Sequence, residues 1–160
     1  MRGTIHGLLS LLLLVVPEAT AQYVCTTNAG SITITKYLGP SGAVSIPAAI
    51  NGLPVTGIGD GAFEVNLSPY LTSVTIPGSV ATIGSDAFDG CTGMTNLVIS
   101  NGVRTIGTDA FAGCVSLTGV TLPGSVTNIG NEPFSQPFHR IYSENAGTSC
   151  LTLPHGRDEK

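Results

Sequence analysis

The chain has 160 residues and a formal net charge of −4, with 10% of its residues charged and 21 glycines. This length suits a single domain. The slight acidic excess excludes the basic face that nucleic-acid binding requires, so we expect no nucleic-acid partner.

The N-terminus has the pattern of a secretory signal peptide over residues 1–21. Arg2 supplies a basic start, Leu8–Val16 is an apolar run, and Ala19–Ala21 ends on the small residues of a cleavage site. The apolar run is too short to cross a bilayer, and no second run follows. We therefore expect export, cleavage before Gln22, and a secreted or cell-surface location without a transmembrane segment.

Residues 22–43 are expected to form an N-terminal cap built on a β-hairpin. Residues 31–35 alternate polar and apolar side chains, as a half-buried strand does, and the turn-forming residues 28–30 precede them. The first coil of a solenoid otherwise exposes its apolar end, which is why a terminal cap is expected here.

The following segment, residues 44–134, repeats itself every 23 residues. A fixed period of this size, with a short strand phrase in each copy, is typical of a leucine-rich solenoid. The sequence predicts three to four coils, of which the first carries insertions near residues 50–54 and 66–69. The recurring apolar residues include Val80, Val103 and Val126, then Ile83, Ile106 and Ile129, then Phe88, Phe111 and Phe134.

Each coil is expected to hold one strand and one short helical turn. Leu71, Val74 and Ile76 have the Leu-x-x-Leu-x-Leu spacing of the strand. Ser85 lies where a helix N-cap is expected, and Asp86 follows it in the first turn. The predicted fold class is a β-rich α/β repeat solenoid, a right-handed leucine-rich repeat superhelix with coils of about 23 residues.

The repeated unit resembles the BspA-type leucine-rich repeats of bacterial surface antigens. It reads Val-Thr-Ile-Pro-x-Ser-Val-x-x-Ile-Gly-x-x-Ala-Phe-x-x-Cys, and residues 74–77, 83–84, 87–88 and 91 carry it in the first regular coil. The resemblance covers roughly residues 44–134. It implies an exported surface protein without catalytic residues or cofactors, and some members of this family bind host extracellular proteins.

After Phe134, residues 135–160 follow no repeat register. Three interpretations stay open: a truncated member of the family, a shifted reading frame, or an end that something else covers. Two histidines of this tail, His139 and His155, have neither a Gly-x-Ser-x-Gly elbow nor a metal-ligand spacing near them. We therefore expect no enzymatic activity.

Four cysteines in an exported chain raise the question of disulfides. Cys91 and Cys114 lie in one column of the repeat, and side chains stacked in parallel fit disulfide geometry poorly. We predict that both are free, buried thiols. Cys25 and Cys150 lie outside the repeat, and whether they pair stays open.

Asp86, Asp109 and Glu132 form an acidic column that has two interpretations. Stacked carboxylates can share a calcium ion. Alternatively, each acid stabilises the positive end of a short helical turn. We favour the second interpretation and assign neither a metal nor a cofactor to the chain. Asp60 is offset by one residue from this column.

The outward, concave side of the strands is the expected binding surface of such a solenoid. It lacks the Trp, Tyr and Arg side chains that dominate binding hot spots. Two functions are compatible with this surface. The first is an adhesion or protein-binding module that contacts extracellular proteins or cell-wall components, with a weak contact from each of many coils. The second is a structural spacer or fragment without a ligand. Tyr37, Phe138 and Tyr142 are further candidate contacts outside the regular coils. The predicted face residues are Ser73, Thr75, Pro77, Asn96, Val98, Ser100, Gly119, Thr121 and Pro123.

Overall fold

The computed structural model describes residues 22–64, 70–135 and 141–143. The predicted signal peptide and most of the predicted tail lie outside the described residues. The same holds for four residues discussed above, namely Phe138, His139, Cys150 and His155.

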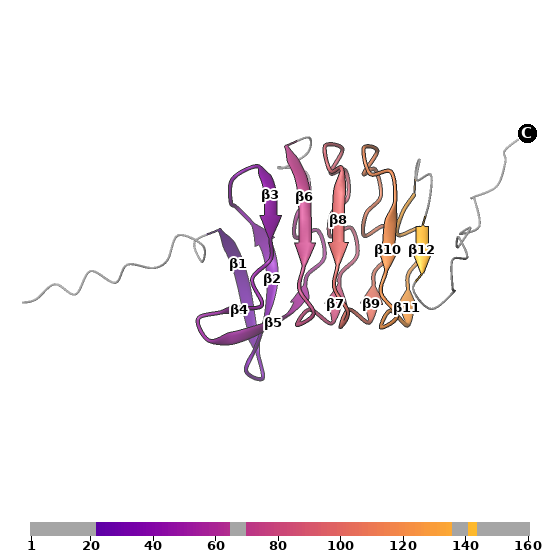
Figure 1. Ribbon diagram of the computed structural model, residues 1–160. Helices are drawn as coiled ribbons and strands as arrows, with labels where there is room; N and C mark the ends of the chain where they lie inside the picture. Colours follow the sequence, from indigo (N-terminus) through magenta and orange to yellow (C-terminus); the bar gives the residue numbers. More distant parts are fainter. Residues whose placement is uncertain (1–21, 65–69, 136–140, 144–160) are drawn as a thin grey trace, which may run out of the picture.

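The described residues fold into twelve strands, and the coils that these strands form follow one another along one axis in chain order (Figure 1). No helix occurs among these residues. The helical part of the predicted α/β class is therefore wrong, and the described coils consist of strands and turns. The strands are β1 Tyr23–Asn28, β2 Ser31–Tyr37, β3 Gly42–Ser45, β4 Ala49–Ile50, β5 Leu53–Ile58, β6 Leu71–Ile76, β7 Thr82–Ile83, β8 Asn96–Ile99, β9 Thr105–Ile106, β10 Val120–Leu122, β11 Asn128–Ile129 and β12 Ile141–Ser143.

One side of the stack is a long sheet with the strand order β1, β2, β5, β7, β9, β11. β1 and β2 pair antiparallel as the predicted hairpin, whereas β2 and the later strands of this order pair in parallel. The register aligns one isoleucine per coil in an inward column: Ile34, Ile58, Ile83, Ile106 and Ile129. Ile83 is 0% and Ile106 1% exposed, but Ile129 in the last strand of this sheet is 39% exposed.

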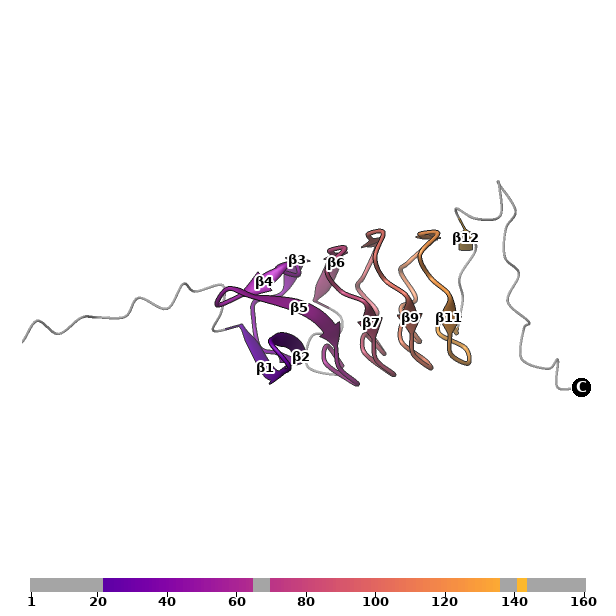
Figure 2. The same ribbon diagram turned by 90° about the horizontal axis from the view of Figure 1, so that it is seen from below.

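The other side of the stack carries β3, β6 and β8 as a parallel sheet, and β10 lies beside β8 (Figure 1). Figure 2 shows β3 and β6 along one side and β7, β9 and β11 along the other. β12 pairs in parallel with β10, with Ile141 opposite Val120. Residues 141–143 therefore extend the stack, although their sequence follows no repeat register.

A continuous column of aromatic rings runs through the core. Neighbouring ring centroids lie 4.5–5.2 Å apart, a spacing at which aromatic pairs stabilise beyond their burial. The column consists of Tyr37, Phe63, Phe88, Phe111 and Phe134.

Tyr37 heads this column, and this position corrects its expected role as an exposed contact. The side chain is 4% exposed, and its hydroxyl donates a hydrogen bond to the carbonyl oxygen of Pro40 over 3.0 Å. The Tyr37 amide also donates to the carbonyl oxygen of Ala62 at 2.8 Å, just as Phe63 donates to Ala87. The first repeat position therefore lies inside the hairpin that was predicted to be only a cap.

The helical turn predicted after each long-sheet strand is a tight turn with a left-handed residue. Asp86 has a φ of 53°, Asp109 of 52° and Glu132 of 45°, values that no α-helix contains. The amide of Phe88 donates to Ala110 in the next coil at 2.8 Å, instead of bonding within its own turn. Cross-coil hydrogen bonding at this corner replaces the helix.

Adjacent coils approach each other through bare backbone at a column of glycines. A Cβ atom on Gly107 would lie 2.5 Å from the carbonyl carbon of Gly84 and 2.5 Å from the amide nitrogen of Ser85. The amide of Gly107 donates to Ile83 in the preceding coil at 2.8 Å, and Gly130 donates to Ile106 in the same way. Glycine is required here because backbone atoms, which cannot move aside, occupy the space of any side chain.

The first coil carries the predicted Asn-Gly insertion as the antiparallel hairpin β4–β5. Asn51 has a φ of 51° and Gly52 of 79°, the pair of left-handed residues that a type I′ hairpin turn needs. Ile50 is only 6% exposed, so the hairpin contributes to the core. The second predicted insertion, near residues 66–69, lies outside the described residues.

Candidate functional site

The strand face is defined as the outward side of β6, β8 and β10, together with the residue that follows each strand and with Gly119, which directly precedes β10. Asn96, Val98 and Thr121 are exposed, and Val98 is the most accessible large apolar side chain on this face, at 44%. The side-chain amide of Asn96 donates to the hydroxyl of Ser73 over 3.1 Å. The partly exposed members are Ser73, Thr75, Pro77, Ser100 and Gly119.

Pro123 is the exception among the nine predicted face residues, because it is buried. It directly follows Leu122, which pairs with Ser143 of β12. Pro77, which follows β6 at the equivalent position, is partly exposed. The accessible strand face therefore ends at Thr121.

The strand face carries no charged side chain, whereas the charges of the described residues lie elsewhere. The two basic residues of the described part of the chain are Lys36 in β2 and Arg104 just before β9. Contacts through the strand face must therefore come from shape and neutral hydrogen bonds, without electrostatic steering. The described acidic residues lie in the loops that follow the long-sheet strands: Asp60, Glu64, Asp86, Asp89, Asp109 and Glu132.

The two aspartates of the acidic column are explained by backbone conformation and not by a helix end. Asp86, Asp109 and Glu132 occupy a left-handed position, and Gly61 occupies it in the first coil with a φ of 59°. Aspartate is among the residues that tolerate this conformation best. Among the residues that the structure describes, no group of three or more His, Cys, Asp or Glu side chains is placed to hold a metal ion.

Replacement of Asp109 distinguishes these interpretations. We expect Asp109→Val to lower the free energy of unfolding by about 1–2 kcal/mol, because a β-branched side chain is disfavoured in the left-handed region. Asp109→Gly is expected to leave stability unchanged or to raise it slightly. Urea denaturation of the three proteins measures both effects. A loss with Gly that equals the loss with Val would show that the carboxylate, and not the conformation, matters.

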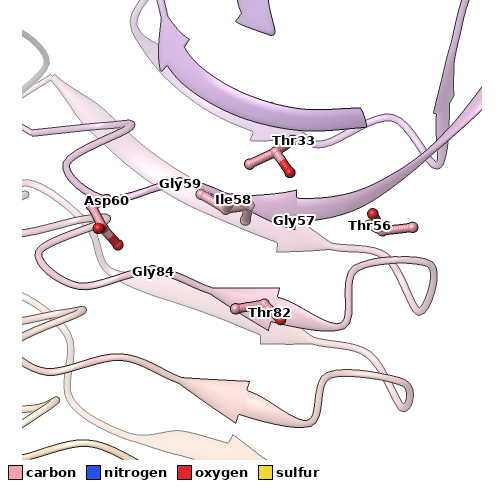
Figure 3. A pocket seen from close by; sticks show the side chains of 8 residues that line it. All are labelled: Thr33, Thr56, Gly57, Ile58, Gly59, Asp60, Thr82 and Gly84. Atoms are coloured by element: carbon pink, nitrogen blue, oxygen red, sulfur yellow. The ribbon is translucent and has the colours of Figure 1, made fainter. Parts of the chain in front are cut away.

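A shallow groove of about 370 Å³ lies over β2, β5 and β7, and Figure 3 shows Asp60 at one end and Thr56 at the other. The Asp60 carboxylate already accepts a hydrogen bond from the amide of Ser85, over 2.8 Å. The hollow exists because three of its eight lining residues are glycines without side chains. It does not combine an apolar enclosure with converging polar groups, as small-molecule sites do. The lining residues are Thr33, Thr56, Gly57, Ile58, Gly59, Asp60, Thr82 and Gly84.

The prediction of free, buried thiols at Cys91 and Cys114 is confirmed. The Cys114 thiol donates to the carbonyl oxygen of Phe88 over 3.3 Å, and the Cys91 thiol donates to that of Phe63 over 3.7 Å. Burial, with a smaller effect of the nearby Asp89 charge, raises the pKa of Cys91 to about 12. Burial also raises the pKa of Cys114, and proximity to Cys91 raises it further.

These raised pKa values predict that both thiols resist alkylation in the folded protein. A maleimide reacts with the thiolate, and the folded chain keeps Cys91 neutral until the pH approaches about 12. We expect labelling of Cys91 and Cys114 only after denaturation, with mass spectrometry locating the label. The raised pKa of Cys91 also makes the free energy of unfolding depend on pH. Its contribution to stability is complete below the ordinary thiol pKa of 9.0 and is lost as the pH rises from there toward about 12. Rapid labelling in the folded state at pH 8 would contradict the burial of these thiols.

Short parallel coils of strands and turns, with aligned isoleucine and phenylalanine columns, define a leucine-rich repeat solenoid. The model of the BspA type leucine rich repeat region matches residues 53–146 in six copies. The chain belongs to the BspA-type leucine-rich repeat family, which confirms the resemblance inferred from the repeated unit. The match also extends past Phe134 and includes β12.

Solved structures of bacterial leucine-rich repeat proteins share this fold. A protein from Bacteroides capillosus is 33% identical, with a TM-score of 0.68, over 77% of this chain and 94% of its own. One from T. pallidum is 34% identical, with a TM-score of 0.59, over 72% of this chain and 64% of its own. A leucine rich cell surface protein from Faecalibacterium prausnitzii is 26% identical, with a TM-score of 0.54, over 83% of this chain and 52% of its own. No curated protein matched the chain. No segment of the described part forms a helix that could span a bilayer.

Proposed function

We propose that this chain is an exported, non-catalytic protein-binding module that acts at or outside the cell surface, and that its strand face makes the contact. The observation that carries the proposal is that the strand face presents a row of accessible, uncharged side chains. Membership in a family of bacterial cell-surface leucine-rich proteins supports the same location and role. The hairpin β1–β2 acts in this proposal as the cap that closes the first coil.

The chemistry of the strand face determines the kind of binding to expect. Asn96 and Thr121 offer hydrogen bonds, and Val98 offers the exposed apolar contact between them. The strand face lacks aromatic or arginine anchors, so each coil of a single molecule contributes little binding energy. Dense display on a surface raises the effective concentration and turns such weak contacts into firm attachment. The proposed partner is therefore an extracellular protein or cell-wall component with many equivalent sites.

The test compares a strand-face variant with a matched variant on the long sheet. The chain, biotinylated and tetramerised on streptavidin, is presented to a panel of extracellular-matrix proteins and cell-wall preparations. We expect Val98→Asp to abolish binding, because a charge at the centre of a neutral contact loses its solvation. Thr82→Asp places the same charge on an exposed strand residue outside the strand face and should bind like the parent chain.

Two outcomes would contradict the proposal. Equal binding by both variants would place the contact outside the strand face. No binding by the tetramer to any component would favour the second candidate function, a structural spacer, which the small and anchor-free side chains of this face also suit. Sequencing of the exported protein from its N-terminus tests the location, with Gln22 expected as its first residue.

A further inference from the structure

The chain contains two Asn-Gly dipeptides, and the fold places them in opposite surroundings. Asn51–Gly52 is the tip of the β4–β5 hairpin, and Asn101–Gly102 lies in the turn between β8 and β9. We propose that Asn51 is a site of spontaneous deamidation in the folded protein and that Asn101 is protected from the same reaction. The asymmetry comes from the hydrogen bonding and packing of the two glycine amides.

The reaction uses only the backbone and solvent water. The Gly52 amide nitrogen attacks the side-chain carbonyl carbon of Asn51 and loses its proton. The bond to the side-chain nitrogen breaks, and ammonia leaves with that proton, so a cyclic imide forms. Water then opens either carbonyl of the imide and produces an aspartyl or an isoaspartyl residue. One water is consumed and one ammonia is released, without any change of oxidation state.

The hairpin tip gives this attack free access. Asn51 is exposed, and a Cβ atom built on Gly52 would meet nothing within 4 Å. Among the described residues, no acceptor binds the Gly52 amide. β4 has only two residues, and so short a pairing opens at little cost. Asn51 can therefore sample the conformation that brings its side chain over the Gly52 nitrogen.

The second dipeptide is held between coils. The Gly102 amide donates to the hydroxyl of Ser125 in the next coil over 2.9 Å, and this hydroxyl donates onward to the Val103 carbonyl oxygen over 2.7 Å. A Cβ atom built on Gly102 would lie 3.0 Å from the Cα atom of Gly78 in the preceding coil. Attack by the Gly102 nitrogen requires this hydrogen bond to break and the coils to separate.

Deamidation at Asn51 changes the hairpin in two ways. Either product adds a negative charge at the tip, and the isoaspartyl product adds one backbone atom to a two-residue turn. Ile50 and Leu53 pair directly across this turn, and Ile50 is buried in the core. The longer backbone disturbs this pairing and loosens the packing of Ile50 at the N-terminal end of the solenoid.

The experiment follows the conversion of both asparagines in the purified chain at mildly alkaline pH, by proteolysis and mass spectrometry. We expect Asn51 to convert at least about tenfold faster than Asn101, because the net contribution of one hydrogen bond is on this scale. Ser125→Ala removes the acceptor of the Gly102 amide and should accelerate conversion at Asn101 while leaving Asn51 unchanged. Asn51→Gln should remove the fast site.

Parallel incubation in concentrated urea keeps the test valid where Ser125→Ala weakens the fold. There the two sites should react at similar rates, because the difference arises from the fold. A difference that persists in urea would assign it to the flanking sequence and overturn the proposal. Equal rates in the folded chain, or faster conversion of Asn101, would overturn it as well.

Discussion

Phe111→Ala is expected to lower the free energy of unfolding by about 3–5 kcal/mol, the usual cost of deleting a buried aromatic ring. The ring is fully buried and stacks between Phe88 and Phe134, with centroid distances of 5.2 Å to each. Its removal leaves a cavity inside the aromatic column that the flanking coils cannot fill, because cross-coil hydrogen bonds hold their backbones in place.

Urea and thermal denaturation followed by circular dichroism measure this loss. Val115→Ala is the matched control, since this residue lies in the same coil but is 52% exposed, and it should unfold like the parent chain. If the two variants have the same midpoint, the aromatic column does not stabilise the solenoid.

Gly107→Ala is expected to have the second large effect, a loss of about 3 kcal/mol or more, beyond the common cost of overpacking. The added methyl group would lie 2.5 Å from backbone atoms of Gly84 and Ser85. Relief requires the two coils to separate, and this separation weakens the hydrogen bond between the Gly107 amide and the Ile83 carbonyl oxygen.

Gly52→Ala serves as the control for Gly107→Ala. Gly52 has a φ of 79° but open space around its Cα atom, so alanine there is strained without a clash. A cost of about 1 kcal/mol is expected for this backbone strain alone. Urea denaturation measures the free energy of unfolding of both variants. Comparable losses would mean that adjacent coils separate at Gly107 at little cost in free energy.

The regular coils could be predicted because their spacing is constant. Phe88 and Phe111 recur with Ile83 and Ile106 at the same interval, and each pair is buried at equivalent places. The same spacing assigned Cys91 to the core column, and its thiol is buried there. In a solenoid, an equal interval in sequence means an equal position in the coil, so burial follows directly from the period.

The start of the repeat could not be found because its spacing is compressed. Ile34 and Tyr37 are three residues apart, whereas Ile58 and Phe63 are five apart, although the pairs occupy equivalent positions. A tyrosine also replaces the phenylalanine. The hydrogen bond from the Tyr37 amide to Ala62 restores the alignment in space that the sequence has lost.

The left-handed corner was mistaken for a helix because its residues suit both conformations. Ser85 before Asp86 fits a helix N-cap, and aspartate is also frequent at positive φ. Gly61 at the same position of the first coil indicates the left-handed conformation, because glycine is favoured at positive φ and disfavoured in helices.

The candidate site could be predicted in outline from the alternation within each strand. Eight of its nine residues are accessible, and the ninth, Pro123, is buried although Pro77 at the equivalent position is partly exposed. The repeat gives no register for residues 141–143, so their pairing with β10 was not predictable. The sequence does not predict a ligand, because small neutral side chains are compatible with partners of many chemical classes.

The bare glycine contact between coils has a consequence for how such chains change length. Each coil presents the same backbone surface above and below, so a duplicated coil inserted by recombination meets the neighbours that its parent had. Such an insertion lengthens the strand face by one strand and the aromatic column by one ring, and it replaces one contact between coils by two equivalent ones. The length of the stack can therefore change by the copying of whole units, with no need to redesign the interior.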